Sequence, residues 1–504
     1  MREKLLRGVA WTSIANLGGQ FLSFVVYIGL ARMLNPRAFG LVSIAAIYIA
    51  FIQVFVTQGF SSAIIQRKDL VEQHLNSAFW IAIATASFFC GLSLLLAGTI
   101  AHSFREPSVA PIIKWLSLSF MLYALSAVPT AILNRELRFG TLAIRSLLAI
   151  GAGGATGLAL ALMGAGVWSL VGQQLVGAAL GCLCLWWAVP WRPRLQVSIQ
   201  HLRDLYRFSI SLTGNELLWF FSQKSDQTVV GYTWGPLALG PYSIASRIVN
   251  LLHDATVGPS QSVLFPALSR LQSDSVRLAG ALYQFCEISS FVLLPLFIGL
   301  AAVAPELVPV LFGAKWVLAV PLVQILGFYG ATRVLLSFMH PLMLAKGRVG
   351  SYLVMNIVLS SLTIICCVSV VHFGPKAVAL AMVFSMLVFE GVFLGTTVSR
   401  LEISARRLLK SFAHPVLLSL IMFIIIAFVR NLLTRELAPT SVLVISIAAG
   451  VAGYIAAALV VKPGLVRTTY EMIVNSVRLS SLPSDARMQA EAVLAADRES
   501  EQLL

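Results

Sequence analysis

Apolar segments long enough to cross a bilayer recur along almost the whole chain, and they constrain its fold more than any other feature. A membrane-spanning helix needs about 20 mostly apolar residues. The composition also indicates a membrane protein, because 58% of the 504 residues are hydrophobic and only 11% are charged, against about 25% charged in soluble domains. The sequence therefore predicts an all-α polytopic membrane protein with about 14 transmembrane helices, at residues 9–31, 39–59, 77–100, 111–133, 141–163, 166–189, 208–232, 236–258, 284–304, 317–345, 349–371, 375–398, 411–430 and 440–461.

The basic residues are distributed unequally between the two sides of these predicted helices. Lys and Arg outnumber those of the opposite side by about three to one on the side of the N-terminus. Loops rich in Lys and Arg stay in the cytoplasm, so we expect both termini there. This bias accounts for most of the net charge of +15, so no nucleic-acid partner is expected.

Motifs for nucleotide hydrolysis or metal chemistry are absent from the sequence. It contains no G-x-x-x-x-G-K-[ST], no H-E-x-x-H and no paired C-x-x-C. Its six cysteines fall in apolar segments, so we expect no disulfide, metal or cofactor. The glycines at 151–157 resemble a dinucleotide loop, but no strand precedes them. Close helix packing through small residues is the better interpretation.

An internal repeat relates the two halves of the chain. Residues 35–45 and 235–245 are identical at six of eleven positions at an offset of 200. Each copy lies in the turn between two predicted helices, the first and second or the seventh and eighth. We predict two six-helix lobes inserted in the same orientation, followed by two extra helices. The expected boundaries are 1–200, 201–400, 401–461 and a cytoplasmic tail at 462–504.

Polar side chains follow one face of the first and seventh predicted helices. Residues 16, 20, 23 and 27 share a helical face, and positions 16, 23 and 27 correspond through the repeat to Glu216, Gln223 and Gln227. A single polar stripe is explained by a helix–helix contact, but two repeat-related stripes favour a cavity between the lobes. We expect Asn16, Gln20, Glu216, Gln223 and Asn250 to line it.

Ionisable residues inside the predicted spans are costly and therefore candidates for function. Three arginines fit an anionic ligand, because the guanidinium group matches phosphate oxygens: Arg247, Arg333 and Arg145. Asp226 and Asp254 are candidates for ion coupling. Two structural alternatives stay open, since Arg247 and Asp254 can pair with neighbours such as Glu216, and Arg145 can extend to the membrane interface.

The chain resembles the multidrug, oligosaccharidyl-lipid and polysaccharide exporter superfamily, and its polysaccharide-transport branch in particular. The resemblance covers residues 1–460 and rests on Gly8-x-x-Trp11, Leu30-Ala31-Arg32-x-Leu34-x-Pro36-x-x-Phe39-Gly40-Leu41-Val42, Gly59-Phe60-x-x-Ala63-x-Ile65-Gln66 and Leu239-Gly240-Pro241-Tyr242. It implies a flippase in the bacterial inner membrane that moves an undecaprenyl-diphosphate-linked oligosaccharide by alternating access. It also implies cavity cations that hold the diphosphate, and a polysaccharide polymerase and synthesis machinery as partners.

Two other functions are compatible with this sequence. An ion-coupled drug or small-solute antiporter of the same superfamily normally has twelve helices and an acidic cavity, which this sequence does not favour. A membrane polysaccharide polymerase or ligase normally has a long loop outside the membrane, and all predicted outward loops are short. We therefore expect a transporter rather than an enzyme.

Overall fold

The fold is taken from a computed structural model, which describes residues 2–67, 69–272, 274–395, 403–434, 436–467, 469 and 471. Within these ranges the description omits the side chains of residues 2–16, 57–63, 65–66, 199–212, 215, 259, 262–263, 336 and 349. The predicted tail at 462–504 and the end of the predicted span 375–398 therefore lie largely outside the described residues.

The described chain consists of helices and short connections, with no strand among the described residues. The elements are α1(Arg2–Met33), α2(Pro36–Gln66), α3(Glu72–Ser103), α4(Val109–Leu116), α5(Leu118–Arg135), α6(Phe139–Leu162), α7(Trp168–Ala188), α8(Ile199–Arg270), α9(Ser275–Phe312), η1(Ala314–Ala319), α10(Val320–Ser337), α11(Met339–Ala345), α12(Val349–Val370), η2(Val371–Phe373), α13(Pro375–Phe393), α14(Ala405–Leu433) and α15(Pro439–Val461).

These elements follow the predicted segments in order. Two predicted spans lie in α8, which reverses direction at Gly235, where φ is +70° and ψ is −172°. Only glycine adopts such a backbone conformation without strain. Eleven of the described helical segments are long and apolar enough to cross a membrane. The polytopic all-α fold is confirmed, whereas the count of fourteen spans stays a prediction.

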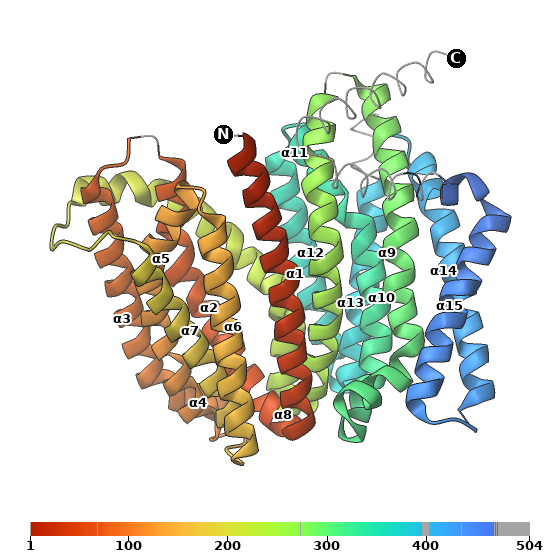
Figure 1. Ribbon diagram of the computed structural model, residues 1–504, viewed down its shortest axis with the longest axis horizontal. Coiled ribbons are helices and arrows are strands. Elements are labelled where there is room, and N and C mark those ends of the chain that lie inside the picture. The colour runs from red at the N-terminus through yellow and green to blue at the C-terminus, as the bar shows by residue number, and fades with distance from the viewer. Residues whose placement is uncertain are drawn as a thin grey trace.

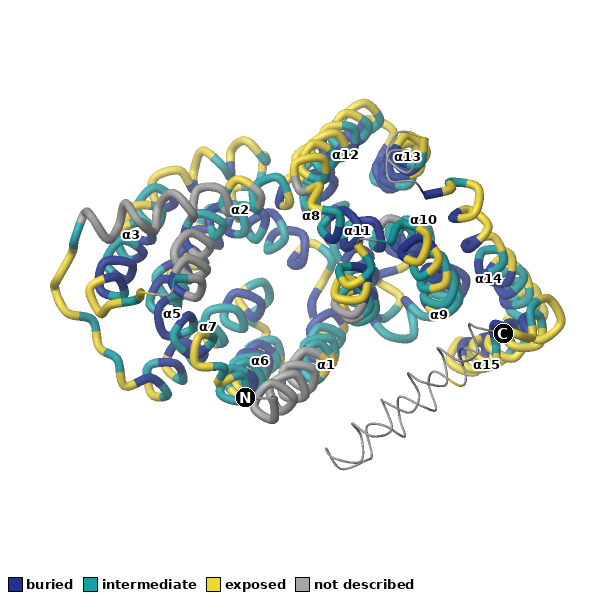
Figure 2. The backbone as a smooth tube through the Cα atoms, turned by 90° about the horizontal axis from the view of Figure 1, so that it is seen from above, coloured by how far each residue is buried: buried dark blue, intermediate teal, exposed yellow. Residues whose placement is uncertain are grey.

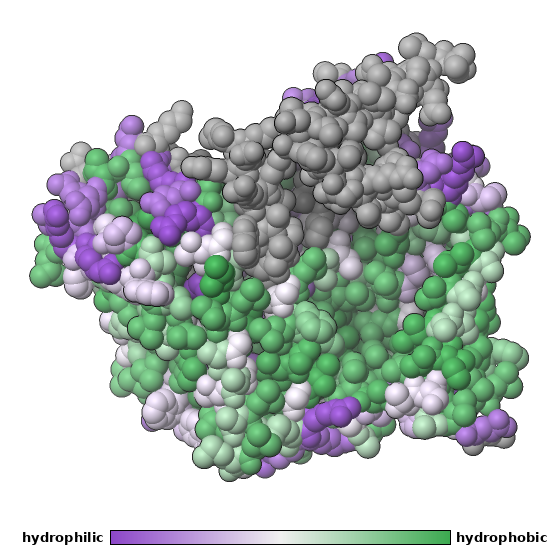
Figure 3. Space-filling model, viewed as in Figure 1, coloured by the Kyte–Doolittle hydropathy of each residue, from purple (hydrophilic) through white to green (hydrophobic). Residues whose placement is uncertain are grey.

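The helices form two groups that lie side by side (Figure 1). Helices α1 to α7 make the first group and α8 to α13 the second, with α14 and α15 at its outer edge, next to α9. The start of α1 and the end of α15 lie on the same face, which we call the terminal face, and the opposite face is the distal face. A broad hydrophobic surface separates polar residues near these two faces (Figure 3).

Small residues bring α6 close to its neighbours, as the sequence predicts. A β-carbon added to Gly153 would lie 2.5 Å from the carbonyl oxygen of Gln173 on α7. One added to Gly154 would lie 2.5 Å from Val26 on α1. The glycines of 151–157 therefore serve helix packing, since any side chain at these two positions would overlap a neighbouring helix.

The repeated turns of the two halves meet each other at the distal face. A β-carbon on Gly40 of α2 would lie 1.9 Å from the carbonyl oxygen of Pro236, and one on Gly240 of α8 would lie 2.1 Å from that of Pro36. The contact is reciprocal, as expected for two copies related by an approximate two-fold axis. It explains why both copies of the repeat keep glycine and proline at these positions.

A second set of contacts joins the two groups at the distal ends of α1 and α9. The Lys315 ammonium donates to the Arg32 carbonyl at 2.7 Å, and Trp316 Nε1 donates to the Ala31 carbonyl at 2.9 Å. In the other direction, Arg32 donates to the carbonyls of Leu311 and Val310. These bonds satisfy carbonyl groups that a helix end leaves without partners, and they hold the two groups together at the distal face. Figure 2 shows the two groups of helices from above, side by side.

Candidate functional site

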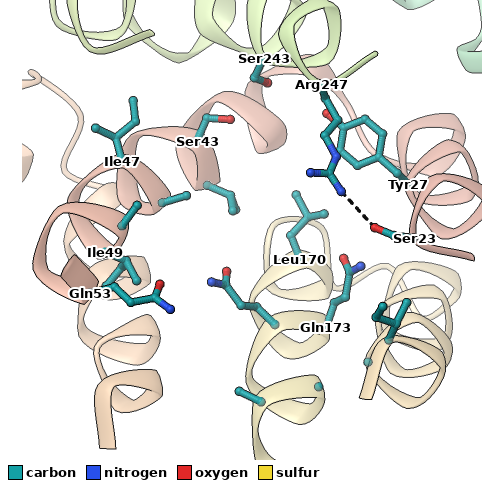
Figure 4. Close-up of a pocket in the computed structure, with 18 of the residues that line it drawn as sticks. Ser23, Tyr27, Ser43, Ile47, Ile49, Gln53, Leu170, Gln173, Ser243 and Arg247 are labelled. Atoms are coloured by element: carbon teal, nitrogen blue, oxygen red, sulfur yellow. Dashed lines mark hydrogen bonds between the residues drawn. The ribbon is translucent and has the colours of Figure 1, made fainter. Parts of the chain in front are cut away.

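A cavity of about 800 Å³, here the main cavity, lies between the two groups of helices. Residues of α1, α2, α5, α6 and α7 form one side of it and residues of α8 the other (Figure 4). No Asp or Glu is among the described residues that line it. The charged and amide side chains of its lining are Arg145, Lys224, Arg247, Gln53, Gln173, Gln174, Gln227 and Asn250.

Arg247 extends from α8 into the main cavity (Figure 4). One terminal nitrogen of its guanidinium donates to Ser23 Oγ on α1 at 3.1 Å. Among the described residues no ion pair of Arg247 is found, so the predicted alternative of static pairing has no support from this geometry. Gln53 and Gln173 face the same space from α2 and α7. Arg247 thus presents a positive charge to a cavity walled by amide groups.

A second cation on α8 lies close to Arg247. Lys224 belongs to the part of α8 that precedes Gly235, and its ammonium lies 3.5 Å from the amide oxygen of Gln227. The reversal at Gly235 brings the two parts of α8 together, so that Lys224 and Arg247 line the same cavity. The sequence predicts the turn between these two parts but not which faces of them meet, so it does not predict this pairing.

Arg145 lines the main cavity from α6. Its Nε donates to the carbonyl oxygen of Gly181 on α7 at 3.2 Å. A β-carbon on Gly181 would lie 3.2 Å from both Nε and one terminal nitrogen of Arg145. The absence of a side chain at position 181 therefore leaves room for the guanidinium, which is held in place by one bond and keeps further donors.

Arg333 lies in a second cavity of about 430 Å³ within the second group of helices. Its guanidinium donates to Asn250 Oδ1 at 2.9 Å and stacks over the ring of Tyr329 at 5.6 Å. Since Asn250 also lines the main cavity, this bond links the two cavities. The sequence predicts one cavity for all three arginines, and the structure separates Arg333 from Arg145 and Arg247.

The two predicted ion-coupling aspartates lie in different surroundings. Asp226 is buried, and one of its oxygens accepts from the Tyr242 hydroxyl at 2.9 Å. Its other oxygen is buried with no hydrogen-bond partner and faces a small cavity that Gln223 and Asn250 also line. Asp254 lies in the second cavity, with its carboxylate 3.5 Å from His253 Nδ1.

The remaining predicted polar residues are not gathered in one place. Gln223 lines the second cavity. Glu216 and Gln20 line neither of the two cavities, although Gln20 Oε1 is buried without a hydrogen-bond partner. The side chain of Asn16 lies outside the described residues. The stripe on α1 reaches the main cavity through Ser23 and Tyr27 instead.

Several lining residues are absent from the sequence-based prediction. Three are amides within apolar helices, which is the signal that could have revealed them: Gln53, Gln173 and Gln174. Two are histidines that line the second cavity, His253 and His340. Their positions along the chain do not show which helix face turns inward.

A helical membrane protein of two repeat-related groups, with a cationic cavity between them, is the fold of a transporter in the exporter superfamily named above. Solved structures agree on the fold. The flippase MurJ in an inward closed conformation shares 17% identity, with a TM-score of 0.73 over 90% of this chain and 99% of that chain. An inward-facing multidrug transporter of the same superfamily shares 16% identity, with a TM-score of 0.61 over 77% of this chain and 99% of that chain.

The profile of the polysaccharide biosynthesis protein family matches residues 29–321, and the chain belongs to this family. The succinoglycan biosynthesis transport protein ExoT of Rhizobium meliloti is 28% identical over 64% of this chain and 66% of its own length. The lipopolysaccharide biosynthesis protein WzxC of Escherichia coli is 27% identical over 69% of this chain and 71% of its own length. The teichuronic acid biosynthesis protein TuaB of Bacillus subtilis is 26% identical over 69% of this chain and 72% of its own length. The matches thus span about two thirds of each relative.

Proposed function

We propose that this protein is a flippase for undecaprenyl-diphosphate-linked oligosaccharide repeat units, which it moves across the bacterial inner membrane for exopolysaccharide or lipopolysaccharide synthesis. The observation that carries the proposal is the main cavity, whose described lining includes three cations, five amide side chains and no carboxylate. Cations suit the diphosphate, and amides suit sugar hydroxyl groups. The relatives named for the biosynthesis of succinoglycan, lipopolysaccharide and teichuronic acid support the same class of cargo.

In this proposal the two lobes, 1–200 and 201–400, move against each other around the main cavity. The contacts of Gly40 with Pro236 and of Gly240 with Pro36 close the distal side, so the described conformation is one in which cargo cannot leave toward the distal face. Breaking these contacts opens that side, and Arg247 releases the diphosphate there. Helices α14 and α15, within 401–461, stand beside α9 as an addition to the second lobe.

The orientation of the protein follows from the positive-inside rule. In our proposal the terminal face is cytoplasmic, with both termini there, and the distal face is periplasmic. Repeat units would be taken up after their assembly in the cytoplasm and delivered to a polysaccharide polymerase on the other side. The tail at 462–504 would extend into the cytoplasm.

Asp226 is the better of the two candidates for ion coupling. It is buried between the two cavities and has one oxygen without a partner, whereas the side chain of Asp254 is 65% exposed. The Lys224 ammonium is near this carboxylate, but burial makes the negative charge costly, which favours binding a proton or a monovalent cation. We propose that such an ion binds at Asp226 during the transport cycle.

A deletion strain tests the proposed function. The undecaprenyl-diphosphate-linked intermediates are extracted from it and quantified together with the surface polysaccharide. The proposal predicts accumulated repeat units and loss of polymer, both restored by the intact gene. Unchanged polymer together with altered sensitivity to cationic drugs would instead favour an antiporter.

A further inference from the structure

The second cavity, within the second group of helices, is a binding space that the proposed function leaves unassigned. Its volume of about 430 Å³ lies in the range of roughly 300–1,000 Å³ that small-molecule sites occupy. Helices α8, α10, α11, α12 and α13 all contribute to its wall. A cavity of this size, built from five helices, is a candidate site for a ligand of its own.

The charges of the second cavity favour an uncharged ligand. Apart from two histidines, the charged side chains of its described lining are Arg333 and Asp254, whose charges offset each other. The described lining of the main cavity has three cations and no carboxylate, although the buried Asp226 carboxylate lies near one of them, Lys224. In the second cavity, Asp254 disfavours an anion and Arg333 disfavours an organic cation.

The polar groups of the second cavity can both donate and accept hydrogen bonds. Asn356 of α12 and Ser222 of α8 line it, and no hydrogen bond of either side chain is found among the described residues. The Asp254 side chain is 65% exposed and adds an acceptor. A sugar hydroxyl group both donates and accepts, so amide, hydroxyl and carboxylate groups together suit a ligand that carries several hydroxyl groups.

Aromatic rings line the second cavity from four helices: Trp219, Tyr329, Tyr352 and Phe389. Two of these rings have one face covered, since Arg333 stacks over Tyr329 at 5.6 Å and the His340 ring lies 4.4 Å from that of Tyr352. Trp219 is 61% exposed, and no ring contact of it is found among the described residues. Its ring is therefore open to a ligand, and the negative face of an aromatic ring attracts the polarised C–H groups of a sugar.

The second cavity also lies close to the cations of α8. Lys224 lines the main cavity, and the residue before it, Gln223, lines the second. On the second part of α8, Arg247 lines the main cavity and Asp254 the second, and these residues are about 10 Å apart along one helix axis. The small cavity shares lining residues with both. A glycan joined to a diphosphate at these cations therefore has the second cavity within reach.

We infer that the second cavity binds uncharged outer sugars of the cargo, with Trp219 against a sugar ring and Asp254 and Asn356 on its hydroxyl groups. This inference rests on the proposed flippase function and divides the cargo between two cavities. The diphosphate and the sugar joined to it occupy the main cavity, and the sugars that follow occupy the second. Arg333, bonded to Asn250 between the two cavities, then borders the glycan rather than the diphosphate.

Protection of two reporter cysteines tests this inference. In the full-length protein without its six native cysteines, Ser43→Cys reports on the main cavity and Met355→Cys on the second. The purified protein is alkylated with N-ethylmaleimide in the presence of undecaprenyl diphosphate linked either to one glucose or to a linear glucose trisaccharide. Both ligands should slow the alkylation of Ser43→Cys several-fold. Only the trisaccharide ligand should slow that of Met355→Cys.

A pair of tryptophan variants shows whether the outer sugars contact the wall of the second cavity or merely obstruct its entrance. Trp219→Ala should raise the concentration of the trisaccharide ligand for half-protection roughly three- to tenfold, the ratio that one aromatic contact supplies. It should leave that of the single-glucose ligand unchanged. The matched control is Trp187→Ala at the end of α7, which is 94% exposed and lines neither cavity. It should change neither concentration.

The outcomes separate this inference from the proposed function. If both ligands protect Ser43→Cys but the trisaccharide ligand leaves Met355→Cys unprotected, the sugar site is wrong while the proposed function stands. The same conclusion follows if Trp219→Ala weakens both ligands equally or weakens neither. If neither ligand protects Ser43→Cys, binding of the cargo in the main cavity fails, and the sugar site fails with it.

Discussion

At the scale of single residues, the proposed function depends most on Arg247. It lies in the main cavity, contacts Ser23 across the boundary between the two groups of helices, and has no acidic partner among the described residues. A cation in this position is expensive to keep in a membrane protein unless a ligand uses it. Lys224 is close enough to interact electrostatically with Arg247, and also with the buried carboxylate of Asp226.

Replacing Arg247 by Gln should reduce transport strongly while preserving the fold. The loss of a charge-assisted hydrogen bond costs roughly 1.5–3 kcal/mol, which corresponds to about a 10- to 150-fold weaker interaction. Surface polysaccharide in a complemented deletion strain measures the effect, with membrane levels of the protein as a control. Arg247→Lys keeps the charge and should be the milder change. Full polymer output from a normally inserted Arg247→Gln protein would remove this residue from the site.

The sequence predicts part of this site and not the rest, for physical reasons. Arg145 and Arg247 could be identified because an arginine within an apolar helix is rare and costly. Arg333 satisfies the same criterion, but the criterion does not say into which cavity a helix face turns. Glutamines such as Gln53 and Gln173 carry no charge, so placing them in a membrane helix costs little free energy. From sequence, a glutamine that lines a cavity therefore cannot be distinguished from one that packs between two helices.

At the scale of helices, the crossing of α2 and α8 connects the internal repeat with transport. Each copy of the repeat contributes one glycine and one proline, and each glycine contacts the proline of the other copy. The sequence reveals the repeat itself, but similarity between two segments does not show that they touch. The sequence predicts the turn that contains Gly235, whereas the approach of the two helices had to come from the structure.

Leucine at Gly40 or at Gly240 should prevent closure of the distal side to a similar extent, because the two contacts are equivalent. The added side chain would overlap a backbone carbonyl, which cannot move aside as a flexible side chain can. Ser43→Cys, in the wall of the main cavity, reports this opening in a background without other cysteines. We expect its labelling by an impermeant maleimide on intact cells to rise several-fold in both variants.

The matched control for these substitutions is Gly98→Leu. An added β-carbon at Gly98 of α3 has no neighbour within 4 Å, so the cavity cysteine should be labelled as in the parent protein. Equal labelling of the parent, Gly40→Leu and Gly240→Leu would show that this crossing does not close the distal side.

The packing of α6 against α7 makes a separate prediction about stability. Gly153→Ala places a methyl group 2.5 Å from the Gln173 carbonyl, and overpacking of this kind costs roughly 1–3 kcal/mol. Gly91→Ala on α3, where the added group meets nothing within 4 Å, should not destabilise the protein. Thermal unfolding in detergent should show a lower Tm for the first variant only, and identical Tm values would contradict this interpretation of the glycines at 151–157.

At the scale of the whole molecule, the composition and the spacing of the apolar segments predict the fold class that the structure shows. The apolar segments match the helices in order, and the α-helical polytopic fold is confirmed. The limits of the helices are less predictable, because they extend beyond the apolar segments into polar residues, as α8 does from Ile199 to Arg270. The relative placement of the two groups depends on side-chain fit, which hydropathy does not describe.

The proposed orientation can be tested with two cysteines on opposite faces. Met163 follows α6 at the distal face and is 80% exposed, while Val197 precedes α8 at the terminal face and is 59% exposed. In a background without the six native cysteines, an impermeant maleimide should label Met163→Cys on intact cells. Val197→Cys should react only after the membrane is permeabilised. The reverse pattern would invert the topology and, with it, the direction of transport.

The central claim is that this protein carries lipid-linked repeat units from one leaflet to the other. The most direct measurement is the leaflet in which these units reside, determined in spheroplasts of a strain that lacks the downstream polymerase. A glycosidase that cannot cross the membrane is added outside, and the cleaved fraction of the undecaprenyl-linked glycan is measured. With the protein present we predict that most of the glycan is cleaved, and without it that the glycan is protected. Equal cleavage in both strains would contradict the account.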